Sequence, residues 1–185
     1  MMKKMEKYFL AILPPEPIMG QAEAIKLGIK EKFGVKYALK SPAHITLKMP
    51  FSYNEVKENV LIDQLKAFAS SQKEFALKIG GIATFGNRVI FLNVKKNELL
   101  VKLQADLKQF CKKTLLLNDE LSDRNFHPHM TLAFKDLKPS VFGEVLEYAK
   151  TQSFESEFSV KDLVLLKRVD HRWIAHFRVP FFKSD

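Results

Sequence analysis

The fold is decided by Phe126-His127-Pro128-His129-Met130-Thr131-Leu132-Ala133-Phe134, because an earlier stretch, Ala43-His44-Ile45-Thr46-Leu47-Lys48-Met49-Pro50-Phe51, has the same pattern. Both contain His-x-Thr-Leu, and both are apolar at alternate positions. Because successive side chains of a strand point to opposite faces, each stretch is predicted to be a strand with one apolar face. The other face then presents an imidazole beside a hydroxyl. These polar pairs are His44 with Thr46 and His129 with Thr131.

The order of the predicted elements around the two stretches repeats, which indicates a duplicated fold. Strand, helix, His-x-Thr strand, helix and long strand occur twice, and Phe75-x-Leu77-Lys78 matches Phe158-x-Val160-Lys161. No linker separates the halves, so residues 1–185 are predicted to form a single bilobal domain built from two similar halves. We expect an α+β fold with two antiparallel sheets around a central cleft, helices packed outside and a pseudo-twofold axis. That symmetry places His44 opposite His129.

Other patterns predict the remaining elements. Apolar residues recur at helical spacing in four segments, and short apolar runs rich in β-branched residues predict further strands. Ser52 and Glu55 have the spacing of a capping box for the second helix, and Asn97 is a predicted cap for the third. Residues 115–126 are interpreted as a loop that leads into the second His-x-Thr strand.

Composition narrows the class of protein. The chain has 30 Lys and Arg against 21 Asp and Glu, a net charge of +9, which favours partners that carry phosphate. No apolar run approaches the roughly 20 residues of a membrane span, so no membrane partner is expected. The sole cysteine, Cys111, excludes an internal disulfide and suits a reducing cytoplasm. We expect a cytoplasmic monomer.

Two histidines facing one cleft suit acid–base chemistry. Unperturbed imidazole titrates near pH ~6.5, so one ring can accept a proton while the other donates one. In-line displacement at phosphorus needs such groups on opposite sides, and threonine hydroxyls can donate to the non-bridging oxygens. The pattern therefore predicts His44 and His129 as catalytic residues and Thr46 and Thr131 as phosphate-binding residues.

Other chemistries remain as alternatives or are disfavoured. Cys111 falls on the inward face of a predicted helix and is interpreted as a core residue. A Walker-type loop is absent from the sequence. A metal site is the main rival, because His127, His129 and His44 could supply three nitrogens. We expect no metal and no cofactor.

The two motifs, Ala43-His44-Ile45-Thr46-Leu47 and His127-Pro128-His129-Met130-Thr131-Leu132, resemble those of the 2H phosphoesterase superfamily and, within it, the 2′-5′ RNA ligase (cyclic phosphodiesterase) family. The resemblance covers the chain from Lys7 to about Phe182, and Phe85–Val94 is similar to the family's middle hairpin. It implies metal-free opening of 2′,3′-cyclic phosphates to 2′-phosphates, with reverse 2′-5′ joining in some members. The implied partner is RNA with a cyclic-phosphate end or a small cyclic nucleotide.

Further residues are candidates for substrate contacts. The resemblance suggests His44 as the acid and His129 as the base. Lys48 is predicted to share the face of His44 and to lower its pKa, which favours the same assignment. The remaining candidates are Phe51 and Phe85 for stacking a base and Arg168 for clamping phosphate, whereas His171 and His176 are predicted to lie on the surface.

A second function stays open at this point. A non-catalytic RNA-binding protein could keep the same fold and charge. A pure binding module has no need of a matched acid–base pair, so the intact His and Thr residues of both motifs favour the enzyme.

Overall fold

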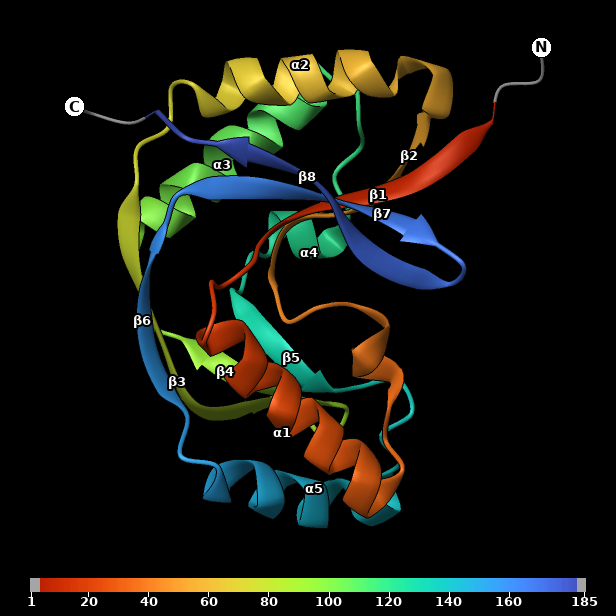
Figure 1. Ribbon diagram of the computed structural model, residues 1–185, viewed down its shortest axis with the longest axis vertical. Coiled ribbons are helices and arrows are strands. Elements are labelled where there is room, and N and C mark those ends of the chain that lie inside the picture. The colour runs from red at the N-terminus through yellow and green to blue at the C-terminus, as the bar shows by residue number, and fades with distance from the viewer. Residues whose placement is uncertain (1–3, 183–185) are drawn as a thin grey trace.

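The strands form one antiparallel sheet in the computed structural model, which describes residues 4–182 (Figure 1). In chain order they are β1 (Met5–Ile12), β2 (Ile45–Asn54), β3 (Phe75–Phe85), β4 (Val89–Val94), β5 (His129–Ala133), β6 (Glu155–Val160), β7 (Asp162–Val169) and β8 (Arg172–Pro180). The helices are α1 (Ile18–Phe33), α2 (Glu58–Ala69), α3 (Glu98–Lys113), α4 (Leu121–Arg124) and α5 (Pro139–Thr151), with 3₁₀ turns η1 (Tyr37–Lys40) and η2 (Glu55–Lys57).

The sheet consists of two lobes that meet at its centre. Its strand order is β6-β3-β4-β5-β2-β1-β7-β8, and β5 and β2 are the central strands. Within residues 4–182, one residue pair, Ile45 with Met130, joins these two strands. The predicted α+β class is therefore confirmed, but the two expected sheets are halves of one curled sheet, because this pair makes the ladder continuous.

Each lobe takes strands from both halves of the chain. The last strand of the first half, β3, continues through a tight turn at Gly86 and Asn87 into β4, so it pairs with strands of the second half. Correspondingly, β7 from the second half pairs with β1. This exchange interlocks the two sequence halves, which fits a domain that cannot be cut at the midpoint of the chain.

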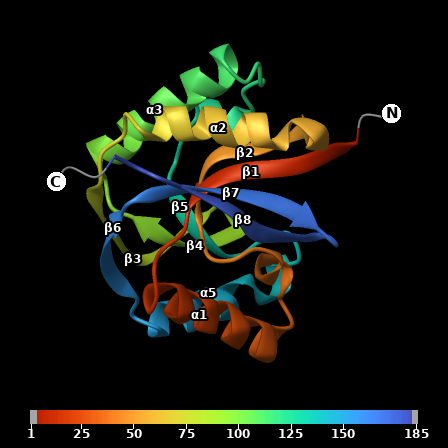
Figure 2. The ribbon, with the colours of Figure 1, turned by 45° about the horizontal axis from the view of Figure 1, so that its top comes forward.

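The helices cover the lobes in pairs. Helices α1 and α5 pack together beneath β3–β5, whereas α2 contacts β8 and α3 contacts β2 on the other lobe (Figures 1 and 2). Asn97 caps α3 as predicted, by accepting a hydrogen bond from Leu100 N. No helix among the described residues is both long enough and apolar enough to cross a membrane.

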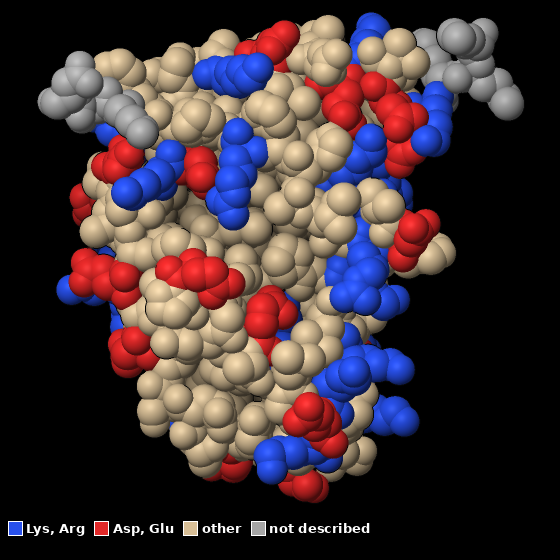
Figure 3. Space-filling model, in the orientation of Figure 1, with Lys and Arg blue, Asp and Glu red and all other residues tan. Residues whose placement is uncertain are grey.

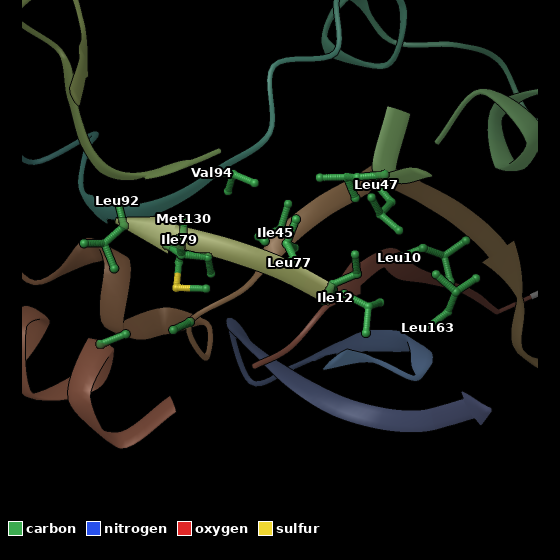
Figure 4. Close-up of a cluster of buried hydrophobic side chains, with 14 of the residues drawn as sticks. Leu10, Ile12, Ile45, Leu47, Leu77, Ile79, Leu92, Val94, Met130 and Leu163 are labelled. Atoms are coloured by element: carbon green, nitrogen blue, oxygen red, sulfur yellow. The ribbon is translucent and has the colours of Figure 1, made fainter. Parts of the chain in front are cut away.

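The main hydrophobic core lies between the helices and the sheet and runs through both lobes. Strand residues at alternate positions supply it, and burying one such aliphatic side chain stabilises the fold by about 1.5–3 kcal/mol. Figure 4 shows Leu10, Ile12, Ile45, Leu47, Leu77, Ile79, Leu92, Val94, Met130 and Leu163 from this cluster. A smaller cluster forms on the other face of the sheet, from Phe9, Ala11, Leu13, Val164 and Leu166.

Two local predictions were wrong. Ser52 and Glu55 do not form a capping box, because β2 continues to Asn54, whose side chain accepts from Val56 N and caps η2 instead. The segment 115–126 is not entirely loop, since it contains the short helix α4.

Candidate active site

A cleft of about 520 Å³ lies on the sheet face that carries the smaller apolar cluster. His44, Thr46, His129 and Thr131 all line it, and each side chain is half-buried. The alternation that puts Ile45 and Met130 in the main core puts their neighbours in the cleft. The structure therefore brings together the four residues that the motifs predict.

The pairing of β2 with β5 places each histidine opposite the threonine of the other motif. Since Ile45 pairs with Met130 in an antiparallel ladder, His44 lies across from Thr131 and Thr46 lies across from His129. Directly opposite side chains in such a ladder have Cβ atoms about 4.5–5.5 Å apart. Each imidazole is thus accompanied by a hydroxyl from its own strand and by one from the partner strand.

Each histidine ring is held by a hydrogen bond to the backbone carbonyl oxygen two residues before it. His44 Nδ1 lies 2.7 Å from the carbonyl oxygen of Pro42, and His129 Nδ1 lies 2.7 Å from that of His127. A carbonyl oxygen only accepts, so each Nδ1 must carry the proton that it donates. Nε2 is left as the nitrogen that can accept a proton from the cleft. Sequence reasoning missed both carbonyl partners, because a backbone oxygen carries no residue signature.

The segment before His44 is fixed by an ion pair from α1. Buried Lys26 donates to Glu23 Oε1 at 2.8 Å and to the carbonyl oxygen of Ser41 at 2.8 Å. Glu23 also accepts from Ala43 N at 2.6 Å. Glu23 and Lys26 are three residues apart in a helix, a common surface pair, so the sequence did not reveal that they position the segment that carries His44.

The pKa values of both imidazoles lie below the ordinary value. Burial, and then the charges of Lys26 and His129, lower the pKa of His44 to about 4. Burial, and then His127, lower the pKa of His129 as well. Both rings are therefore mainly neutral at pH 7 in the free protein.

The prediction that Lys48 shares the face of His44 and Thr46 is wrong. The pairing register of β2 against β1 shifts between Thr46 and Phe51, so the alternation of faces is broken there. Lys48 pairs with the core residue Leu10, and only 1% of its surface is exposed. The charge that acts on His44 comes from Lys26 and not from Lys48.

Lys48 instead anchors the segment before the second motif. Its ammonium group pairs with Asp123 and donates to the carbonyl oxygen of Asn118 at 2.7 Å. Asp123 also accepts from Met49 N at 2.8 Å and from Glu120 N at 2.9 Å. This network holds residues 118–125 against β2, and Ser122 and Asn125 of that segment line the cleft.

Aromatic side chains flank both histidines. The ring centroid of Phe85 lies 4.9 Å from that of His129, and Phe91 packs 5.0 Å from the same imidazole. On the other lobe, Phe9 lies 4.9 Å from His44 and 4.8 Å from Trp173. The sequence identified Phe85 but not Phe9 or Trp173, because these two fall in strands that carry no motif.

Of the other residues considered from the sequence, two line the cleft and two do not. Arg168 and His171 line the cleft from the β7–β8 hairpin, and His171 is exposed there. Phe51 does not line the cleft, because it packs 6.1 Å from Tyr8 on the core side. His176 lies away from the cleft and hydrogen-bonds Glu58 at 2.8 Å.

Two further predictions concern reactive groups. Cys111 is fully buried in the main core, as predicted, and burial raises its pKa to about 12. Among residues 4–182, no group of three or more His, Cys, Asp and Glu side chains is placed to hold a metal ion. Independence from metal stays a prediction.

Comparison with known proteins identifies a family and relatives that match most of the chain. A sequence model described as the 2′-5′ RNA ligase superfamily matches residues 14–172. The chain is 27% identical over 173 residues to a Bacillus cytotoxicus protein named "Putative phosphoesterase Bcer98_0945", covering 92% of this chain and 94% of that one. It is 28% identical over 167 residues to a Geobacillus protein with the same descriptive name, covering 89% and 90%.

Solved structures share the fold. Escherichia coli LigT complexed with 3′-AMP has a TM-score of 0.64 and 19% identity, over 97% of this chain and 100% of LigT. TT0787 of Thermus thermophilus has a TM-score of 0.64 and 17% identity, over 95% and 98%. At these identities the likeness concerns the fold.

Proposed function

Because this chain belongs to the 2′-5′ RNA ligase superfamily, we propose that it is a metal-independent cyclic phosphodiesterase, which opens the 2′,3′-cyclic phosphates of RNA ends or nucleotides to 2′-phosphates. The observation that carries the proposal is the pair of imidazoles His44 and His129, each with Nδ1 bound to a carbonyl oxygen and each across from a threonine of the other strand. A binding protein has no use for two imidazoles held in this matched way.

The geometry fits an in-line displacement. Nε2 of one histidine takes a proton from water as the water oxygen bonds to phosphorus, and the bond between phosphorus and O3′ breaks. Nε2–H of the other histidine gives its proton to O3′, so charge is conserved. Thr46 and Thr131 donate to the non-bridging oxygens, where negative charge grows in the transition state.

The pKa order assigns the two roles. The active form carries one proton on the pair, and that proton resides on His129 because the pKa of His44 is lowered to about 4. His129 is therefore the proposed acid and His44 the proposed base. This reverses the assignment expected from the sequence, which came from the family resemblance and from the prediction that Lys48 lies in the cleft beside His44.

The same pair supports 2′-5′ joining. A 5′-hydroxyl of RNA would take the place of the attacking water, in line with O3′. One histidine accepts the proton of this hydroxyl as its oxygen bonds to phosphorus, and the other histidine protonates O3′ as the bond between phosphorus and O3′ breaks, which leaves a 2′-5′ linkage. Escherichia coli LigT has been crystallised with 3′-AMP and with NADP⁺, so a protein of this fold accommodates nucleotide phosphates. These complexes support a nucleotide as the substrate of this chain.

A substrate screen tests the proposal. Adenosine 2′,3′-cyclic phosphate, an RNA oligonucleotide with a cyclic-phosphate end and ADP-ribose 1″,2″-cyclic phosphate are incubated with the protein in excess EDTA. We expect ring opening of at least one substrate at a rate that EDTA does not change. Activity lost to chelation and restored by zinc or manganese would replace the metal-free mechanism, and no turnover of any substrate would leave the RNA-binding alternative.

A further inference from the structure

A group of cations surrounds one tyrosine in the same cleft. The ammonium nitrogens of Lys40 and Lys135 lie 4.7 and 4.5 Å from the ring centroid of Tyr37, and Lys135 donates to the Tyr37 hydroxyl at 3.0 Å. The hydrogen bond from Lys135, together with the charges of Lys40 and Arg168, lowers the pKa of Tyr37. All four side chains line the cleft, and we call them the Tyr37 cluster.

The cluster is built and not a chance meeting of surface lysines. The carboxylate of Asp136 accepts from Lys36 N at 2.8 Å and from Tyr37 N at 3.0 Å, which fixes η1 to the turn after β5. Phe134 packs edge-on against Tyr37 at 5.1 Å. Lys135, which lies between Phe134 and Asp136 in the sequence, has a φ of 53°. This left-handed conformation is unfavourable for any residue other than glycine, and here it places the lysine ammonium group over the Tyr37 ring.

No carboxylate of the described residues neutralises the positive charges of the cluster. Across residues 4–182, none of Lys40, Lys135 and Arg168 forms an ion pair with a carboxylate. The neighbouring Asp136 accepts from backbone N–H groups through Oδ2, and its buried Oδ1 has no hydrogen-bond partner among these residues. Like charges at this spacing repel one another, and a bound anion removes that repulsion. Lys and Arg side chains also gather along the side of the molecule that carries the β7–β8 hairpin and η1 (Figure 3).

The cluster is close enough to the histidines for one ligand to reach both. Lys135 follows Thr131 by four residues, so at most about 14 Å of extended chain separates their backbones. The cluster is also distinct from the His–Thr pairs, because it comes from η1, the turn after β5 and the end of β7. A single molecule with two phosphates could therefore occupy the two places together.

We propose that the Tyr37 cluster binds a second phosphate of the substrate, so that the preferred substrate carries an anionic group besides its cyclic phosphate. The inference rests on the proposed function. The second phosphate belongs either to the neighbouring 3′,5′ linkage of an RNA end or to a pyrophosphate. The Tyr37 ring holds the two ammonium groups near each other, through cation–π contacts with both and a hydrogen bond from Lys135 to its hydroxyl.

Kinetics on matched substrates test the proposal. The wild type is compared on adenosine 2′,3′-cyclic phosphate and on the dinucleotide ApA with a 2′,3′-cyclic phosphate end. We expect kcat/KM to be about tenfold higher for the dinucleotide, mainly through a lower KM, because a charge-assisted phosphate contact increases affinity by about one order of magnitude. Lys135→Gln should reduce this ratio to within about twofold of one, whereas Lys138→Gln, an exposed lysine outside the cleft, should preserve it.

A binding measurement separates failure of this inference from failure of the proposed function. Titration calorimetry compares 3′-AMP with ApA 3′-phosphate, and neither ligand requires turnover. Tighter binding of the dinucleotide that is lost in Lys135→Gln, with a smaller salt dependence, supports the site even if no cyclic phosphate is opened. The inference is overturned if Lys135→Gln prefers the dinucleotide over 3′-AMP as strongly as the wild type does. It is also overturned if Lys138→Gln weakens this preference as much as Lys135→Gln does. Comparison with ADP-ribose 1″,2″-cyclic phosphate then distinguishes a pyrophosphate from an RNA linkage.

Discussion

Ile45 of β2 pairs with Met130 of β5, and each of these core residues directly follows a cleft histidine. This backbone pair joins the two lobes of the sheet in the part of the chain that the structure describes. The contact that makes the sheet continuous is therefore the contact that sets the distance between His44 and His129. Stability of the core and geometry of the site depend on the same two residues.

The first prediction concerns pH. The active free enzyme carries one proton on the histidine pair, and both pKa values are lowered from 6.5. As pH falls toward about 4, His44 becomes protonated and the base is lost; as pH rises through the pKa of His129, the acid is lost. The profile of kcat/KM should therefore be a bell whose optimum lies below pH 6.5.

Initial rates at low substrate between about pH 3.5 and 8 provide this profile. The profile of kcat should shift to higher pH, because the negative charge of bound substrate raises both histidine pKa values. An optimum of kcat/KM above about pH 7 would contradict the lowered pKa values and the roles drawn from them.

The second prediction concerns the product. With water in line with O3′, adenosine 2′,3′-cyclic phosphate should give adenosine 2′-phosphate. Phosphorus NMR against both monophosphate standards distinguishes the products. A 3′-phosphate would mean that O2′ leaves and that the sugar is bound in the opposite orientation between the two histidines.

The third prediction concerns the buried pair of Lys48 and Asp123. Lys48→Met leaves the Asp123 carboxylate buried without its counter-charge, which should lower the free energy of unfolding by about 3–5 kcal/mol. Lys66→Met is the matched control, because Lys66 and Asp63 form an exposed pair 3.3 Å apart, and it should cost less than about 1 kcal/mol.

Urea unfolding of the three proteins measures both changes. Adding Asp123→Asn to Lys48→Met should recover part of the loss, because the amide is neutral and its oxygen still accepts from Met49 N. Equal losses in the two single variants would show that the pair does not anchor the segment 118–125.

The sequence predicted which motif side chains share the cleft better than it predicted their surroundings, for a physical reason. His44, Thr46, His129 and Thr131 were found because period-two alternation is a local property and holds on both sides of the Ile45–Met130 pair. The same rule failed at Lys48, where a shift in strand register turned the side chain to the other face. Such a shift depends on the neighbouring strand, which a single stretch of sequence does not show.

The single sheet and the Tyr37 cluster were missed for a related reason. Period-two alternation predicts where strands occur but not which strands pair, so it could not reveal the exchange of β3 and β7 between lobes. Tyr37 and Lys135 are 98 residues apart and carry no motif. They are brought together by the hydrogen bonds that the backbone of Lys36 and Tyr37 donates to Asp136 and by the packing of Phe134 on Tyr37. Long-range contacts between loops leave no periodic pattern.

The most direct test of the account is the rate of ring opening by His44→Ala, His129→Ala and the double variant, each checked for folding by circular dichroism. Each single change should lower kcat by about 10²–10⁴, because each removes one proton-transfer group. The double variant should be little slower than the slower single variant, since the two groups act as a unit. Wild-type rates in either single variant would contradict the acid–base pair.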